Sequence, residues 1–209
     1  MTEKAPPRSK LREVRLLLWV LVVLAVVGIG ALLLVQRVTV HPPQAVAPAA
    51  QSSFGGPFTL VGADGKPFSS AKLLGKPYLM YFGFTRCGDV CPTTLSRLVK
   101  LRNQVGGPDA FRIVFVTIDP THDGPKEVGQ YAQLFNSPII GLTGNQAQID
   151  QVKKQYGIYA QAVPNAPMGQ QMQHTATVLL FDPAGKFVGT ITPNEPDSSA
   201  LTTLKQLIG

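Results

Sequence analysis

Apolar and polar residues follow two different patterns along this chain, and the first is an unbroken apolar run. Residues 16–36 contain no charged side chain. As a helix, a run of this length extends about 30 Å, which is enough to cross the hydrocarbon core of a bilayer. The apolar core of a cleaved signal peptide is shorter, about 7–15 residues. The pattern therefore predicts one uncleaved transmembrane helix at residues 16–36.

The second pattern covers residues 54–209, where short strand-like apolar runs alternate with helix-like periodicity. Strands are predicted at 58–61, 67–68, 76–84, 111–118, 139–142, 175–181 and 187–191, and helices at 92–104, 125–135, 145–156 and 197–208. The Gln-, Pro- and Met-rich residues 157–173 are expected to be irregular. Because strands and helices alternate and the chain ends with a hairpin and a helix, we expect a three-layer α/β domain with a mixed central sheet.

Basic residues are concentrated beside the apolar run. Residues 1–37 carry six Lys and Arg against two Asp and Glu, and residues 38–209 carry thirteen against ten, so +4 of the net +7 lies in the first segment. Five of the six basic residues precede the run, and the positive-inside rule therefore places residues 1–15 in the cytoplasm. No basic stripe with interleaved aromatic residues is present, so the sequence gives no reason to expect a nucleic-acid partner.

This orientation predicts a single-pass protein of the cell (inner) membrane, with its C-terminal domain on the periplasmic or outer face. That compartment is oxidising, and thiols there are readily converted to disulfides. Residues 37–53 are rich in Pro and Ala and are predicted to form a semi-extended tether between the anchor and the domain at 54–209.

The chain contains two cysteines, Cys87 and Cys91, between a predicted strand and a predicted helix. Pro92 disfavours helical dihedral angles at the residue before it, so Cys91 is expected at the helix N-cap or beside it. The helix dipole and the free N–H groups there favour a thiolate and lower the pKa of a cysteine. Two thiols on one turn predict a site for a soft metal ion or a redox-active dithiol. A structural disulfide is the third interpretation, although a domain of this size hardly needs one.

A metal site with two thiolates needs a further ligand, and the chain has three histidines. His41 falls in the predicted tether and is interpreted as a solvated residue. His122 follows the strand at 111–118, at the sheet edge where the cysteines are expected, but a surface histidine is favoured there. His174 precedes the strand at 175–181, and the residues alone leave it open between a ligand and an ordinary loop histidine. Cysteine together with imidazole suits copper or zinc.

Three methionines also bear on a soft metal site. Met80 lies in the predicted buried strand and is assigned to the core. Met168 and Met172 fall in the irregular segment near His174. Thioethers bind Cu(I), but two scattered methionines are more often ordinary loop residues, so neither is included in the predicted site.

The segment GFTRCGDVCPTTL, which begins at Gly83, closely resembles the signature of the Sco/SenC family. Members of that family are membrane-tethered copper proteins with a thioredoxin-like fold that help to assemble the binuclear copper centre of cytochrome c oxidase. The resemblance implies a thioredoxin-like domain over residues 54–209. It also implies that Cys87, Cys91 and His174 bind one copper ion, as Cu(I) or Cu(II). The family's Asp-Pro loop is matched by Asp119-Pro120 and Asp123.

Three positions depart from the family pattern. Gly88 stands where proline usually follows the first cysteine, Arg86 replaces a common aromatic residue, and Gln173 replaces an acidic residue before the histidine. None of these changes removes an implied ligand. Arg86 is expected to favour a thiolate through its charge.

The leading hypothesis is therefore a copper metallochaperone that serves the copper-bearing subunit of cytochrome c oxidase. Other expected partners are a second periplasmic copper chaperone, a thioredoxin-like reductant and, through residues 16–36, the membrane. The alternative is a thiol–disulfide reductase that uses Cys87 and Cys91 to keep the acceptor's cysteines reduced. A peroxidase of the same fold is a weaker third hypothesis, because no peroxide-binding constellation is visible.

Overall fold

The computed structural model describes residues 10–38, 54–168 and 171–209. The chain divides into two compact units, Met1–Ser52 and Ser53–Gly209. His41 and residues 39–53 of the predicted tether lie outside the described residues.

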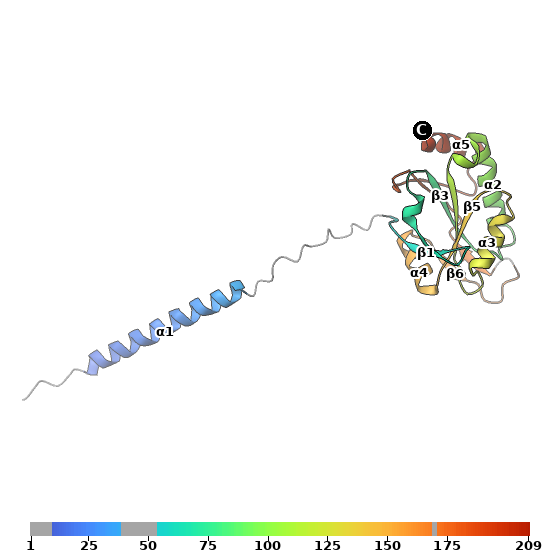
Figure 1. The fold of residues 1–209 in the computed structure, drawn as a ribbon. Helices are drawn as coiled ribbons and strands as arrows, with labels where there is room; N and C mark the ends of the chain where they lie inside the picture. Colours follow the sequence, from blue (N-terminus) through green and yellow to red (C-terminus); the bar gives the residue numbers. More distant parts are fainter. Residues whose placement is uncertain (1–9, 39–53, 169–170) are drawn as a thin grey trace, which may run out of the picture. The chain divides into compact units, whose positions relative to one another are not determined.

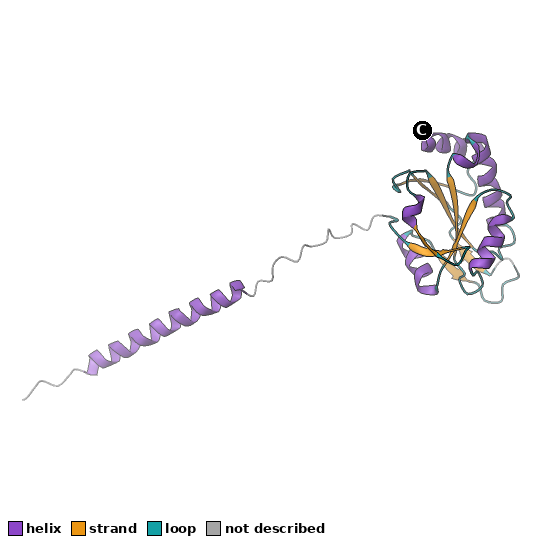
Figure 2. Ribbon diagram, in the orientation of Figure 1, coloured by secondary structure: helices purple, strands orange, loops and turns teal. Residues whose placement is uncertain are grey.

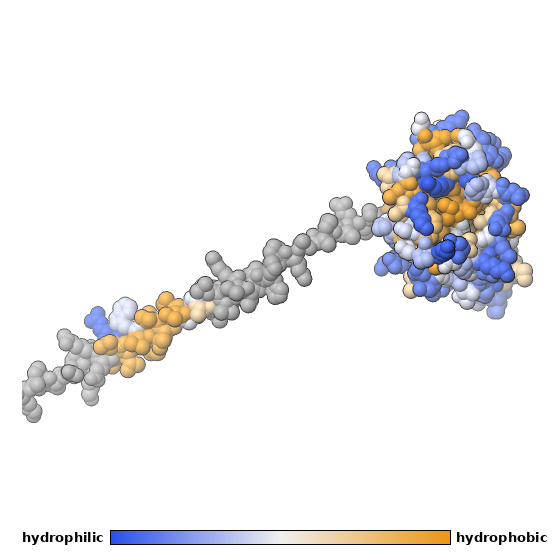
Figure 3. Space-filling model, in the orientation of Figure 1, coloured by the Kyte–Doolittle hydropathy of each residue, from blue (hydrophilic) through white to orange (hydrophobic). Residues whose placement is uncertain are grey.

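The first unit contains helix α1 (Lys10–Val38), which includes the predicted span (Figure 1). Its Val14–Ala31 segment is long and apolar enough to cross a membrane, and none of this segment is buried against other described residues. Figure 3 shows apolar surface along this helix.

The second unit is built on a seven-stranded sheet in the order β2-β1-β5-β4-β3-β8-β9. The strands are β1 (Thr59–Gly62), β2 (Pro67–Ser69), β3 (Tyr78–Gly83), β4 (Arg112–Thr117), β5 (Ile139–Thr143), β8 (Val178–Phe181) and β9 (Phe187–Ile191). Strands β3, β4 and β5 are parallel, whereas β8 and β9 on one side and β1 and β2 on the other are antiparallel to their neighbours. The mixed sheet expected from the sequence is thus confirmed.

Helices cover the sheet, as Figures 1 and 2 show. They are α2 (Val90–Val105), α3 (Pro125–Gln133), α4 (Gln146–Gln155) and α5 (Asp197–Ile208), with short 3-10 turns η1 (Ser70–Leu73) and η2 (Gly107–Asp109). The connections β3-α2-β4 and β4-α3-β5 step across the sheet in one direction, so right-handed crossovers put α2 and α3 on the same face. Helix α4 lies across the sheet from α3, as Figure 1 shows. Helix α5 packs against α2.

The core lies on both faces of the central strands. All six residues of β3 are buried, as expected for a strand covered on both sides by helices. The predicted core positions of α4, Ile149 and Val152, are also buried. These layers fix the strand ends at one edge of the sheet, where the candidate site lies.

Two sequence expectations were wrong. The segment expected to be irregular contains a second, two-stranded sheet, in which β6 (Ala160–Ala162) pairs with β7 (Met172–His174). Cys91 is neither the N-cap nor its neighbour: helix α2 begins at Val90, and Asp89 is its N-cap residue. Pro92 is tolerated inside the first turn because N–H groups there have no partner within the helix to lose.

Candidate metal centre

Strand directions bring the three predicted site residues to one edge of the sheet. Cys87 lies in the loop that follows β3, and Cys91 lies in the first turn of α2. Because β8 runs antiparallel to β3, it begins at the edge where β3 ends. His174 ends β7, a few residues before β8, and so reaches the cysteines from the opposite end of the sequence.

The Cys91 sulfur lies 3.7 Å from His174 Nε2. The Cys91 backbone N–H donates a hydrogen bond of 3.3 Å to the Cys87 sulfur, and both cysteines are free thiols. His174 Nδ1 lies 2.9 Å from the carbonyl oxygen of Thr175. That oxygen can only accept, so Nδ1 carries the proton and Nε2 presents a lone pair toward the sulfurs.

This geometry can be compared with that of a metal site. With metal–sulfur and metal–nitrogen distances of about 2.3 and 2.0 Å, two tetrahedral ligands of one ion stand roughly 3.5 Å apart. The Cys91–His174 separation of 3.7 Å is close to that value. In the described part of the chain, no three His, Cys, Asp or Glu side chains already form a complete metal-binding group. Cys87, Cys91 and His174 would therefore have to come closer together when an ion binds.

The two thiols differ sharply in acidity. A hydrogen bond from the Cys91 thiol is the main cause that lowers the pKa of Cys87 to about 4, and bonds from backbone N–H groups add to it. The pKa of Cys91 is raised far above its usual range, because its thiol donates to Cys87 and because it is buried. We expected the helix terminus to favour a thiolate at Cys91, and that expectation was wrong: the N–H group there serves Cys87 instead.

Aromatic rings enclose the inner side of the site. Phe84 and Tyr81, both buried, meet the His174 ring edge-on at centroid distances of 6.0 and 6.3 Å. On the outer side, a cavity of about 610 Å³ opens onto Cys87 and His174. The site is therefore closed toward the core and accessible from one direction.

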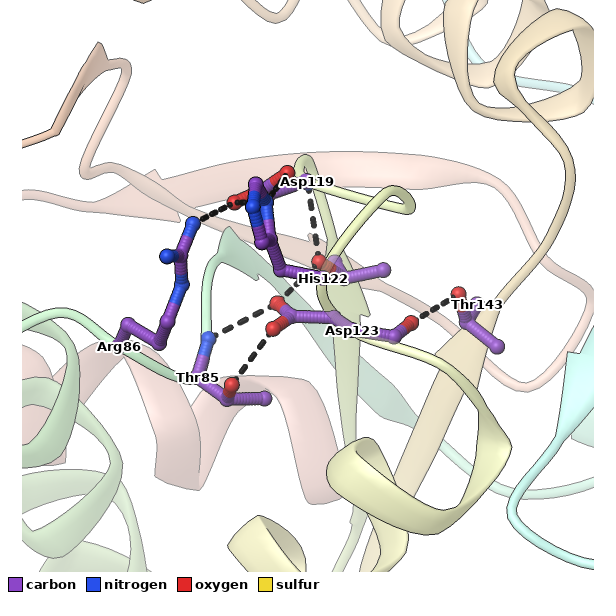
Figure 4. Close-up of polar contacts among 7 residues, drawn as sticks. Thr85, Arg86, Asp119, His122, Asp123 and Thr143 are labelled. Atoms are coloured by element: carbon purple, nitrogen blue, oxygen red, sulfur yellow. Dashed lines mark hydrogen bonds and ion pairs between the residues drawn. The ribbon is translucent and has the colours of Figure 1, made fainter.

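Asp123 holds the loop that carries Cys87. Its buried carboxylate accepts hydrogen bonds from the Thr85 backbone N–H at 2.9 Å, the Thr85 hydroxyl at 2.5 Å and the Thr117 hydroxyl at 2.6 Å. Thr143 donates to the Asp123 carbonyl oxygen at 2.6 Å. The network joins the ends of β3, β4 and β5 (Figure 4) and fixes the chain two residues before Cys87.

Asp119 forms a second contact with the same loop. Its carboxylate lies 2.7 Å from Arg86 Nη2 and 2.9 Å from His122 Nδ1 (Figure 4). Partial burial alone would raise the pKa of the Asp119 carboxyl, but the contacts with His122 and Arg86 outweigh it and lower that pKa. We expected Arg86 to stabilise a cysteine thiolate by its charge; it pairs with Asp119 instead, and hydrogen bonds account for the acidity of Cys87.

The three residues predicted from the sequence, Cys87, Cys91 and His174, lie together in the structure, but the contacts around them were not predicted. His122, expected at the surface, is half-exposed and paired with Asp119. Met172, which was left out of the predicted site, lines the same cavity as Cys87 and His174. The period-2 spacing of Met172 and His174 was the available signal, but it has meaning only once the segment is known to be a strand.

Comparison with known proteins gives consistent results. The SCO1/SenC family model matches residues 46–209. The chain is 34% identical over 160 residues to the yeast (Saccharomyces cerevisiae) mitochondrial protein SCO2, covering 75% of this chain and 53% of that protein. It thus spans about half the length of the first curated relatives that it matches.

Solved structures give the same result. Copper-bound ScoI of Bradyrhizobium japonicum superposes with a TM-score of 0.66 at 34% identity, over 74% of this chain and 99% of that one. BsSco, described as a Sco-family cytochrome c oxidase assembly protein with a disulfide switch, superposes with a TM-score of 0.59 at 26% identity, over 75% and 94% of the two chains. The fold is therefore thioredoxin-like, and the chain belongs to the SCO1/SenC family.

Proposed function

We propose that this protein is a membrane-anchored copper chaperone that delivers copper to the binuclear copper centre of cytochrome c oxidase and so assists its assembly. Cys87, Cys91 and His174 are the proposed ligands. The observation that carries the proposal is the approach of Cys91 and His174 to 3.7 Å beside the free Cys87 thiol. Copper-bound relatives and an oxidase-assembly relative in the same family support it.

The donor set suits a copper ion that must be both held and released. Two thiolates favour Cu(I), and the imidazole adds a ligand that also suits Cu(II). Cys87 is already a thiolate near neutral pH because its pKa is about 4, so binding displaces the proton of the Cys91 thiol. Release to cysteines of an acceptor proceeds by exchange of one thiolate for another, and the open side of the cavity provides the access.

The proposed topology assigns a role to each segment. Residues 1–15 lie in the cytoplasm, residues 16–36 cross the cell membrane, and residues 37–53 tether the copper-binding domain at 54–209 on the periplasmic or outer face. The basic residues before the apolar helix support this orientation. Anchoring confines the site to the membrane surface, where an integral oxidase subunit is found.

Copper titration tests the assignment of His174. The full chain, reduced and solubilised in detergent, is titrated with Cu(II) and followed by its thiolate-to-copper absorption. We expect His174→Ala to weaken Cu(II) binding and change the spectrum. His122→Ala, a matched change on the same sheet edge, should leave both unaltered. Equal affinity and an unchanged spectrum for His174→Ala would sink the three-ligand assignment.

A second candidate is thiol–disulfide reduction of the acceptor. The acidity of the half-buried Cys87 and the burial of Cys91 favour it, because this is the division between an attacking and a resolving thiol. The Cys87 thiolate attacks an acceptor disulfide and releases one acceptor thiolate. The Cys91 thiolate then attacks the Cys87 sulfur, which releases the second, so the acceptor is reduced and the Cys87–Cys91 pair is oxidised. A separate thiol reductant must restore the pair.

The two functions differ in their dependence on His174 and on copper. Reductase activity toward a disulfide peptide should persist in His174→Ala and in the presence of a copper chelator, whereas copper loading should not. Turnover that is fast, catalytic and insensitive to both changes would favour the reductase as the main function.

A further inference from the structure

Met172 and His174 occupy equivalent positions on one short strand. They are two residues apart in β7, so their side chains project to the same side, and Gln173 between them projects to the other. Their exposure follows this alternation, because Met172 and His174 are half-buried while Gln173 is exposed. Met172, Gln173 and His174 all line the 610 Å³ cavity that Cys87 also lines, and of these three Met172 and His174 are the half-buried ones.

The backbone that carries Met172 is fixed by pairing. Met172 stands opposite Ala162 in the two-stranded sheet, and His174 stands opposite Ala160. The Val163 N–H donates to the Gln171 carbonyl oxygen at 2.8 Å, which extends the pairing by one step. Met172 also packs against the edge of the main hydrophobic core. It is therefore held beside His174 and is not a freely moving loop residue.

Met168, in the same segment, is arranged differently. Its side chain is 91% exposed, and it does not line the cavity. The two methionines therefore share a chemical group and a neighbourhood in the sequence but differ in their position relative to the cysteines. This contrast makes Met168 an internal control for any role assigned to Met172.

A thioether has a restricted preference among metal ions. It is soft and uncharged, so it binds Cu(I) readily and contributes little to Cu(II), which prefers imidazole and thiolate. We propose that Met172 is an additional ligand of this site that is selective for Cu(I). This inference rests on the proposed copper-binding function and specifies which oxidation state the cavity wall favours.

The chemistry of the cavity follows from that assignment. On the same strand, His174 offers an imidazole that binds both Cu(I) and Cu(II), and Met172 offers a soft, neutral thioether. Both lie next to the two cysteine sulfurs. Cu(I) delivered through the open side meets the Met172 thioether in the wall before or while it reaches the thiolates. No electron transfer is involved, because the ion enters and leaves as Cu(I) and only its ligands change.

The test uses Met172→Leu, which keeps the side-chain volume and removes the sulfur. Cu(I) affinity of the full chain in detergent is measured without oxygen by competition with bicinchoninate, and Cu(II) affinity by titration. We expect a loss of Cu(I) affinity of roughly tenfold, the lower end of what loss of a supporting group costs at metal sites. Cu(II) affinity should be unchanged, so the reduction potential of the bound copper should fall by about 59 mV. Met168→Leu should match the wild type in all three.

A spectroscopic measurement is independent of affinity. Protein containing selenomethionine and loaded with Cu(I) should show a copper–selenium distance in X-ray absorption. That signal should vanish in Met172→Leu and persist in Met168→Leu. Its absence in the parent protein, or equal losses of Cu(I) and Cu(II) affinity in Met172→Leu, would overturn the inference. If the parent protein binds no copper, the proposed function fails as well; if only His174→Ala impairs binding, the inference alone fails.

Discussion

The Cys91 sulfur and His174 Nε2 lie 3.7 Å apart although 83 positions of sequence separate them. The approach is a product of strand direction. Cys91 enters the site from the end of β3, and His174 comes just before β8, which runs antiparallel to β3 and begins at the same edge. The central sheet therefore brings the proposed ligands together, and changes in the packing of that sheet should displace the Cys91 sulfur.

Gly83 provides the most direct test of the link between sheet packing and the position of the Cys91 sulfur. A Cβ at this position would stand 2.9 Å from the Cys91 sulfur, 3.1 Å from Phe115 Cε2 and 3.2 Å from Tyr81 Cε1. Since all three neighbours are buried and packed, Gly83→Ala should lower the free energy of unfolding by about 1–3 kcal/mol. It should also displace the Cys91 sulfur and weaken copper binding. Urea denaturation and copper titration measure the two effects.

The control for this change lies elsewhere in the same sheet. A Cβ at Gly189 in β9 would meet nothing within 4 Å, so Gly189→Ala should alter neither stability nor copper affinity. Should Gly83→Ala bind copper as well as Gly189→Ala does, the close packing of Gly83 against Cys91 would have no role in the site.

The unequal acidity of the two thiols predicts selective alkylation. The lowered pKa of Cys87, about 4, means that its thiolate persists down to that pH. Iodoacetamide should therefore modify Cys87 in the reduced protein at about pH 6, where an ordinary thiol of pKa about 8.5 is almost fully protonated. Cys91 should remain unmodified, because it is buried and its pKa is raised. Peptide mapping by mass spectrometry distinguishes the two sites.

Cys91→Ala tests the cause of the lowered Cys87 pKa. The hydrogen bond from the Cys91 thiol is the largest influence on Cys87, and its loss should move the alkylation midpoint of Cys87 upward toward about 8.5. A wild-type midpoint already near that value, or equal labelling of both cysteines, would contradict the assignment of Cys87 as the acidic thiol.

The parts of this structure that the sequence predicted are those with local signals. Strand and helix periodicity located the main elements, and the strand-turn-helix position of Cys87 and Cys91 marked the site. His174 was assigned to the site only by resemblance, because no local pattern shows that β8 returns beside β3. The same limit explains the β6-β7 hairpin: its strands have three residues each, too few for alternation to stand out from a Gln- and Pro-rich segment.

Side-chain partners were the least predictable level. Arg86 precedes Cys87 in sequence, and proximity alone made its charge look available to the thiolate. The structure instead directs it to Asp119, which follows the next parallel strand. A partner of this kind depends on the register between β3 and β4, which composition and periodicity do not specify. The prediction that Cys91 lies at or beside the N-cap was wrong for a related reason. Pro92 restricts the dihedral angles of the residue before it but does not decide where the helix begins.

The Asp123 network predicts a large stability effect from a single residue. Asp123→Ala removes three charge-assisted hydrogen bonds and leaves the part-buried donors of Thr85 and the buried hydroxyl of Thr117 without their acceptor. We expect a loss of at least about 3 kcal/mol in the free energy of unfolding of the reduced protein, measured by urea denaturation. Asp64→Ala, which removes one exposed hydrogen bond to Lys66, should cost no more than about 1 kcal/mol. Similar values for the two variants would show that the Asp123 network does not hold the loop.

Asp119 predicts a specific dependence of stability on pH. Its pKa is lower in the folded protein than its unfolded value of about 3.9, because His122 and Arg86 outweigh the effect of burial. As pH falls, the unfolded chain takes up the proton first. The stabilisation by Asp119 is therefore complete above about pH 5 and is lost as pH falls through the folded pKa. Asp119→Asn lacks this contribution, so the difference in unfolding free energy between wild type and variant should shrink from about pH 5 downward.

His122→Gln tests which contacts lower the Asp119 pKa. It removes the hydrogen bond of 2.9 Å but leaves the Arg86 ion pair, so the folded pKa of Asp119 should lie closer to its unfolded value. The loss of stabilisation should then be smaller than in wild type and be complete at a higher pH. Urea denaturation across a pH series, with Asp119→Asn made in wild type and in His122→Gln, measures the pH range over which each protein loses the stabilisation by Asp119. If Asp119→Asn changes the unfolding free energy by the same amount from about pH 5 to about pH 3, the carboxylate does not stabilise the fold through its charge. In that case the ion pair between Asp119 and Arg86 beside Cys87 would position the two side chains without contributing to stability.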